Sequence, residues 1–162
     1  MHRYAIALGS NRRHGLYGSP EGVLRAAMTM LGDDVTVTAL SPPLATVAMG
    51  ERGRRFANAA ALLETKLDPP SLLARLKALE RRFGRRRGRR WGARVLDLDI
   101  LLWSGGRWRS RHPALAIPHP HLEKRRFVLD PLVRIAPRWP LPGRAIRVAQ
   151  AHARLTAPRP LL

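Results

Sequence analysis

The sequence predicts an α+β fold of the ferredoxin-like type, with a βαββαβ core in which helices pack on an antiparallel sheet. Three observations support this prediction. Strand-like segments, rich in alternating or β-branched apolar residues, lie at 4–8, 35–40, 56–66 and 94–103. Segments with helical apolar spacing follow the first and the third of them. The chain has 162 residues, which is enough for one domain with a substantial core.

The first half of this pattern has clear boundaries. The first strand contains Tyr4 and ends at the turn residues Gly9-Ser10-Asn11. Ser19-Pro20-Glu21 supplies a capping side chain, a first-turn proline and an early acid, so a helix is expected to begin there. Gly32 ends this helix. The alternating segment Val35–Leu40 is the second strand.

The second half repeats the pattern and then adds a C-terminal part. A strand is expected at Phe56–Lys66, a helix opening at Asp68 and stopping at Gly84, and a strand at Arg94–Trp103. The segment "RWRS" (107–110) is expected to return as a short strand. We predict a single domain over 1–162, with its core at about 2–137 and loosely ordered residues from about 153.

The composition indicates a soluble globular protein with an anionic partner. Hydrophobic residues make up 45% of the chain and charged residues 25%. No apolar stretch is long enough to span a bilayer, and without cysteine there is no thiolate metal site. We therefore expect a cytoplasmic protein without a membrane partner, and a monomer. The net charge of +19 fits either a nucleic acid or a small polyanion such as a nucleotide.

Two carboxylates in "LDLDI" are candidate metal ligands. Residues two apart on a strand face the same way, so Asp97 and Asp99 project together while Leu96, Leu98 and Ile100 face the core. Two adjacent carboxylates repel each other unless a cation lies between them. Oxygen ligands without histidine or cysteine suit Mg²⁺ shared with phosphate oxygens. The alternative is a solvated strand face paired with nearby arginines.

An arginine-rich segment at 84–94 lies between the second helix and this strand. Glycines at 84, 88 and 92 interrupt it, which is typical of a loop rather than a helix face. Arginine presents forked donors to phosphate oxygens, so the loop can close over a triphosphate. Trp91 either packs on a base or anchors the loop. The alternative is a solvated basic loop.

Three further residues are candidates for ligand binding. His119 lies between two prolines and can donate to a phosphate; its spacing from His121 resembles a zinc site, but no third ligand is nearby. Phe127 either stacks on a planar ring or packs in the core. Asn58 lies in an apolar strand, where it reads an amide-like ring edge or is satisfied structurally.

Together these segments resemble one family, 6-hydroxymethyl-7,8-dihydropterin pyrophosphokinase of folate biosynthesis. The resemblance extends from Tyr4 to about Pro137. It rests on four blocks in order: Gly9-Ser10-Asn11, "FANAA" (56–60), "RRWGARVLDLDILL" (89–102) and "IPHPHLEKRRFVLDPL" (117–132). The third is the most specific, because Trp91-Gly92, Arg94 and the Asp-x-Asp pair keep the order and spacing of the family signature.

The resemblance implies an enzyme that transfers the β,γ-pyrophosphoryl group of ATP to the hydroxymethyl oxygen of the pterin and releases AMP. It implies two Mg²⁺ ions bound by Asp97 and Asp99, and catalytic loop arginines Arg85, Arg87, Arg90 and Arg94. It places Glu80, Trp91, Ile100, His119 and Arg125 near the nucleotide. It assigns pterin binding to Thr46, Val47, Ala48, Met49, Phe56, Asn58 and Phe127. No specific nucleic acid is then expected as a partner.

Three departures from the family pattern qualify this assignment. The loop is shorter by about one residue than in some relatives, so Arg90 and Arg94, fixed by their spacing to Trp91, match more securely than Arg85 and Arg87. "SPPL" (41–44) imitates the threonine-led pterin segment, but spacing to Asn58 favours 46–50. The extra residues after Asn11 are expected to form a surface loop. The alternative function is a basic nucleic-acid-binding module on the same fold.

Overall fold

The computed structural model describes residues 1–47, 55–84 and 95–158. Its strands and helices are β1 (His2–Ser10), α1 (Pro20–Thr29), β2 (Val35–Leu40), β3 (Leu44–Val47), β4 (Arg55–Thr65), α2 (Pro69–Arg82), β5 (Asp97–Trp103), β6 (Trp108–Arg111), β7 (Ala114–Ile117), the 3₁₀ helix η1 (Leu122–Lys124), α3 (Arg126–Ile135) and α4 (Val148–Thr156). The predicted order βαββαβ corresponds to β1, α1, β2, β4, α2 and β5, so the predicted fold class is confirmed.

The central sheet is antiparallel, with the strand order β2-β4-β1-β5. The long strand β4 pairs with β2 along one half and with the short strand β3 along the other. Ser41 joins these two partners: its N–H donates to Ala60 O at 2.9 Å, and its Oγ accepts from Ala60 N at 2.9 Å. The "SPPL" segment therefore includes the bend between β2 and β3, and Thr46 lies within β3.

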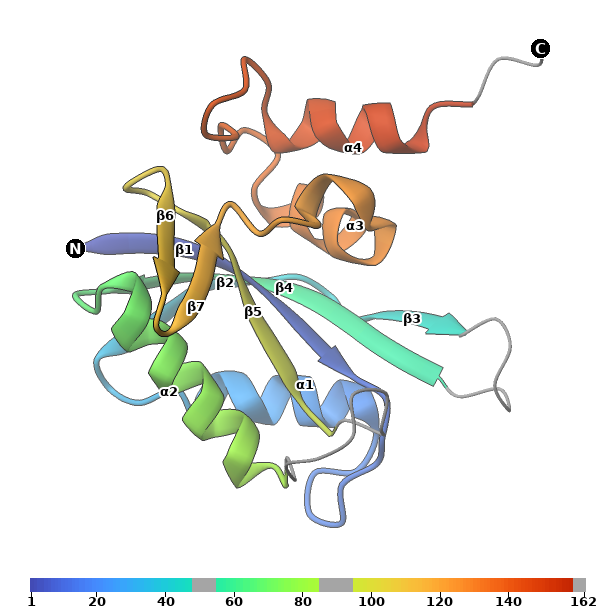
Figure 1. Cartoon of the computed structure of the whole chain (residues 1–162). Coiled ribbons are helices and arrows are strands. Elements are labelled where there is room, and N and C mark those ends of the chain that lie inside the picture. Colours follow the sequence, from blue (N-terminus) through green and yellow to red (C-terminus); the bar gives the residue numbers. More distant parts are fainter. Residues whose placement is uncertain (48–54, 85–94, 159–162) are drawn as a thin grey trace.

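Helices cover both faces of this sheet (Figure 1). On one face, α1 and α2 pack against the large side chains of β1, Tyr4, Ile6 and Leu8. On the other face, α3 packs over Ala5 and other small or aliphatic residues, and α4 packs on the outer side of α3 (Figure 1). Because side chains alternate along a strand, β1 presents bulky residues to one layer and small ones to the other. This asymmetry leaves space on the α3 side.

The predicted helix starts are confirmed by their capping hydrogen bonds. Ser19 Oγ accepts from Gly22 N at 3.3 Å, and Asp68 Oδ1 accepts from Ser71 N at 2.9 Å. The positive φ angles of Gly32 (103°) and Gly84 (93°) explain why glycine follows each helix. The helix α1 ends at Thr29, slightly before Gly32.

Three details differ from the sequence-based expectations. The expected short strand at 107–110 is present as β6, but it pairs with β7 in a separate two-stranded sheet. The helix α4 continues through Thr156, so the expectation of loose order from residue 153 is wrong for 153–156; its buried residues Val148 and Ala151 anchor it to the α3 layer. The expected surface loop after Asn11 is partly packed, because Tyr17 lies against Phe83 with ring centroids 5.1 Å apart.

Among the described helices, none combines the length and the apolar character that crossing a bilayer requires.

Candidate active site

The two aspartates of β5 lie on the α3 side of the sheet. Asp97 and Asp99 are partly exposed, whereas Leu98 and Ile100 are buried in the core beneath α1 and α2. The alternation predicted from "LDLDI" is therefore confirmed. This arrangement places two carboxylates on one surface, where their like charges repel unless cations compensate them.

A small hollow of about 60 Å³ brings the aspartates together with residues from β1, β4 and the start of α3. Its lining is Ala7, Leu8, Gly9, Asn58, Asp97, Asp99, Leu101, His119, Arg125, Phe127 and Val128. The small residues of β1 are what leave this space open: a Cβ added to Gly9 would lie 3.5 Å from Asn58 Oδ1. Ala7 was not among the site residues expected from the sequence. Alternation along the strand was the available signal, because Ala7 must face the side opposite to its core-facing neighbours Ile6 and Leu8.

The hollow has one end suited to a flat polar ring. Asn58 Nδ2 donates to Thr46 Oγ1 at 3.2 Å, which orients the amide across β3 and β4. Phe127 lies on the rim and is 44% exposed, unusual for a large apolar side chain. Phe56 does not line the hollow, but two residues from Asn58 it lies on the same face of β4. An amide and an exposed aromatic ring can hold a heterocycle by edge hydrogen bonds and stacking.

Other residues that line the hollow are suited to phosphate. His119 is held by its backbone N–H, which donates to Leu101 O at 3.0 Å, and its Nδ1 accepts from His121 N at 3.1 Å. Burial lowers the pKa of His119 below its usual value, and the nearby carboxylate of Asp99 acts in the opposite direction. The guanidinium of Arg125 lies 5.7 Å from the ring centroid of Phe127. Arg125 therefore lies beside Phe127, and both line the same hollow.

Two side chains of α2 meet β5 from the other layer. Glu80 is completely buried, and its Oε1 accepts from Leu98 N at 2.8 Å and from Lys77 Nζ at 2.7 Å. Lys77 Nζ also donates to Leu98 O at 2.9 Å and lies 3.9 Å from Asp99 Oδ1. Sequence reasoning missed Lys77; its position one helical turn before Glu80, in a helix otherwise apolar on that side, was the available signal.

The remaining predicted residues contribute less to the hollow or lie outside the described residues. The side chain of Ile100 is in the core, so within this arrangement only its backbone faces a ligand. Val47 ends β3. Those outside the described residues are Ala48, Met49, Arg85, Arg87, Arg90, Trp91 and Arg94.

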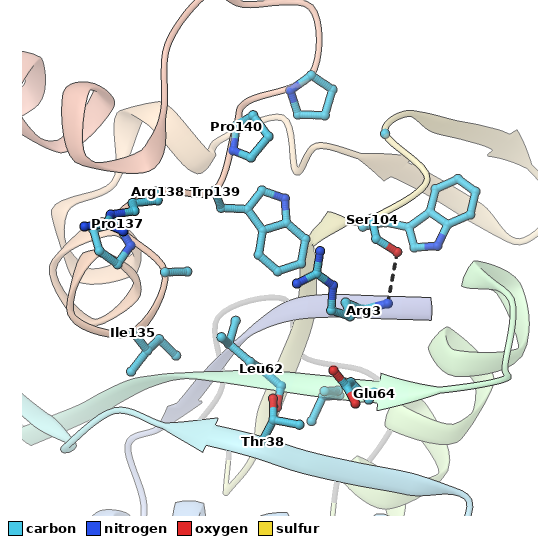
Figure 2. A pocket seen from close by; sticks show the side chains of 15 residues that line it. Arg3, Thr38, Leu62, Glu64, Ser104, Ile135, Pro137, Arg138, Trp139 and Pro140 are labelled. Atoms are coloured by element: carbon cyan, nitrogen blue, oxygen red, sulfur yellow. Dashed lines mark hydrogen bonds between the residues drawn. The ribbon is translucent and has the colours of Figure 1, made fainter. Parts of the chain in front are cut away.

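A larger cavity of about 550 Å³ lies elsewhere, between the sheet and the segment after α3 (Figure 2). Arg3, Glu64, Ser104 and Trp139 are among its lining residues, and the guanidinium of Arg3 lies 5.8 Å from the Trp139 ring centroid. None of the predicted site residues lines it. We therefore place the chemistry in the smaller hollow, where carboxylates, an amide, a histidine and an arginine converge.

The donor set of the hollow fits a hard divalent cation that is also held by phosphate. Within the described parts of the chain, no group of three or more His, Cys, Asp or Glu side chains could hold a metal alone. Asp97 and Asp99 supply oxygen ligands only, which suits Mg²⁺ with its remaining positions filled by phosphate and water.

Comparisons with known proteins identify the family of this chain. The model of the family 7,8-dihydro-6-hydroxymethylpterin-pyrophosphokinase (HPPK) matches residues 5–137. A 2-amino-4-hydroxy-6-hydroxymethyldihydropteridine pyrophosphokinase of Pseudomonas aeruginosa is 39% identical over 145 residues, covering 88% of this chain and 85% of the relative. The Methylorubrum extorquens protein of the same name is 35% identical over 154 residues, covering 93% of each.

A solved structure shares the fold at much lower identity. Plasmodium falciparum HPPK-DHPS aligns with a TM-score of 0.69 at 12% identity, covering 94% of this chain and 41% of that longer one. This likeness concerns the fold alone. The family match and the two close relatives show that the chain belongs to the 7,8-dihydro-6-hydroxymethylpterin-pyrophosphokinase family.

Proposed function

We propose that this protein transfers the pyrophosphoryl group of ATP to 6-hydroxymethyl-7,8-dihydropterin, giving AMP and the pterin diphosphate for folate synthesis. The observation that carries the proposal is one hollow in which Asp97 and Asp99 face Asn58 and Phe127. It thereby pairs candidate metal ligands with a candidate ring-binding end. The hydroxymethyl oxygen attacks the β-phosphorus, the bond from that phosphorus to the α–β bridging oxygen breaks so that AMP leaves with this oxygen, and the hydroxyl proton passes to solvent water.

Asp97 and Asp99 are the proposed Mg²⁺ ligands. Bound Mg²⁺ would neutralise phosphate charge and align the reacting groups. The carboxylates stand on a regular strand whose neighbouring residue, Leu98, is fully buried, so their spacing is set by the sheet. Arg125 and His119 approach the same hollow and are suited to donate to phosphate oxygens. The loop arginines Arg85, Arg87, Arg90 and Arg94, together with Trp91, are proposed to add contacts to ATP.

Asn58 and Phe127 are the proposed pterin-binding residues, with Phe56 on the second side of the ring. The Asn58 amide is already oriented by Thr46, so its carbonyl oxygen is presented to donors on a ring edge. The segment 46–49 is proposed to contact the pterin mainly through its backbone. Phosphoryl transfer depends chiefly on alignment and charge neutralisation, so no strong base is required.

AMP release tests this function. Purified protein is incubated with ATP, with and without the pterin and Mg²⁺, and AMP is separated by ion-exchange chromatography. We expect AMP only when all three are present. Folded protein that forms no AMP under these conditions would refute the proposal, and tight RNA binding that weakens steeply with salt would then favour the nucleic-acid alternative.

A further inference from the structure

In the described part of the chain, side chains of α2 and not another strand pair with the outer edge of β5 at Leu98. β5 is the last strand in the order β2-β4-β1-β5, and edge strands leave backbone groups without strand partners. At Leu98, the residue between the two aspartates, Glu80 Oε1 accepts from the N–H at 2.8 Å and Lys77 Nζ donates to the C=O at 2.9 Å. The helix α2 therefore fixes the backbone that carries both carboxylates.

The same contacts decide which carboxylate engages Lys77. Its ammonium lies 2.7 Å from Glu80 Oε1 and 3.9 Å from Asp99 Oδ1, so the closer ion pair is with Glu80. The Glu80 side chain is fully buried, whereas that of Asp99 is 40% exposed. A buried charge left without a counter-ion is costly, and the partly exposed Lys77 supplies a counter-ion to the buried Glu80.

We propose that Glu80 is a positioning residue for the metal site: it retains the Lys77 ammonium on the α2 side of β5 and so leaves Asp99 available to a divalent cation. This inference rests on the proposed function, because it assumes that Asp97 and Asp99 bind Mg²⁺ with ATP. Without the negative charge of Glu80, the nearest carboxylate to Lys77 among these contacts is Asp99. Lys77 then competes with the cation for that oxygen.

Substitution by glutamine separates this role from simple stabilisation. In Glu80→Gln the amide oxygen can still accept from Leu98 N, but the charge that holds Lys77 is gone. In the double variant Lys77→Gln/Glu80→Gln, the competing cation is also gone. If Glu80 has a purely structural role, the double variant should need as much Mg²⁺ for nucleotide binding as Glu80→Gln does. If Lys77 competes with the cation, the double variant should need less Mg²⁺ than Glu80→Gln.

Isothermal titration calorimetry with the non-reactive analogue α,β-methylene-ATP, repeated over a series of Mg²⁺ concentrations, measures the Mg²⁺ needed for half-maximal binding. We expect Glu80→Gln to raise that concentration about 10-fold, as outer-shell substitutions typically do. The double variant should return to within about twofold of the wild type, the scatter expected of independent changes. Lys77→Gln alone should not raise the Mg²⁺ concentration needed for half-maximal binding.

Arg75→Gln is the matched control. Arg75 lies on the same helix and also joins a carboxylate to a backbone carbonyl, those of Asp34 and Leu31, away from the hollow. It should lower the melting temperature without changing the Mg²⁺ requirement.

The outcomes separate the two proposals. If the wild type binds the analogue equally well with and without Mg²⁺, the proposed metal site and this inference are both overturned. Wild-type binding that needs Mg²⁺, with an unchanged Glu80→Gln or an unrescued double variant, would overturn the inference alone. If Glu80→Gln does not fold, the double variant decides, because it removes both charges: a Mg²⁺ requirement raised about 10-fold would overturn the inference, and one within about twofold of the wild type would support it.

Discussion

The side-chain amide of Asn58 donates to the hydroxyl of Thr46 across two paired strands, at 3.2 Å. This bond fixes which end of the amide faces the hollow, because the nitrogen is committed to Thr46 and the oxygen lies toward Gly9. A single hydrogen bond between strands can thus orient the group proposed to read the pterin edge.

Replacing Asn58 by alanine should therefore weaken pterin recognition. We expect kcat/KM for the pterin to fall about 10- to 100-fold, the effect of losing one or two buried hydrogen bonds to a substrate. Thr46→Val should give a smaller loss, because the amide remains but is no longer oriented. Steady-state kinetics with the pterin varied at saturating ATP would measure both, and an unchanged kcat/KM in Asn58→Ala would contradict the assignment.

The small residues of β1 allow a steric test of the same hollow. A side chain at Gly9 would enter the space beside Asn58 Oδ1, where an added Cβ already lies at 3.5 Å. Gly9→Val should fold, since valine suits a strand, but should lower kcat/KM for the pterin by about 10-fold or more by overfilling the site. A variant with wild-type kinetics would show that the ring does not occupy this space.

Removing one carboxylate tests the metal assignment. Asp97→Asn or Asp99→Asn should lower kcat by roughly 10²- to 10³-fold, the usual effect of losing one group that stabilises transition-state charge. Stability should be equal or slightly higher, because the repulsion between neighbouring carboxylates is relieved. AMP release and thermal unfolding measured on the same preparation would check both, and full activity in either variant would refute the role of that residue.

The sequence predicts the order of the helices and strands better than it predicts the contacts between layers. Strand alternation and capping chemistry gave the order of elements and the common face of Asp97 and Asp99. The pairing of β6 with β7 is local, because only residues 112 and 113 separate the two strands, but no strand was expected at Ala114–Ile117. Helical spacing places Lys77 beside Glu80 on α2, but it cannot show that both side chains reach the backbone of Leu98, which is 21 residues from Lys77 and lies in the sheet.

A buried hydrogen bond made by Tyr4 should contribute to stability in the layer of α1 and α2, away from the hollow. Tyr4 is fully buried, and its Oη donates to Leu67 O at 2.8 Å. Burial raises the pKa of Tyr4 far above its usual value, so the hydroxyl remains a donor. Tyr4→Phe should lower the free energy of unfolding by about 1–2 kcal/mol, because the carbonyl loses its partner. Urea unfolding would measure this loss, and kcat should stay unchanged.

The ion pair between Asp34 and Arg75 should make stability depend on pH. The Arg75 guanidinium makes two hydrogen bonds to the carboxylate, at 2.6 and 2.8 Å, and holds the pKa of Asp34 below its usual value. A carboxyl group whose pKa is lower in the folded state adds stability above its unfolded pKa of about 3.9. That contribution declines as the pH falls below this value and is lost once the folded carboxylate is protonated.

Asp34→Asn isolates this contribution, because it keeps the shape of the side chain and removes its charge. The wild type should melt at a higher temperature than the variant at pH 7, and the difference should shrink as the pH falls below about 4. High salt at pH 7 should also reduce it, since both side chains are more than a third exposed and their attraction is screened. A difference in melting temperature that is the same at pH 3 as at pH 7 would show that the Asp34 charge does not contribute, and that any loss in Asp34→Asn comes from altered hydrogen bonding.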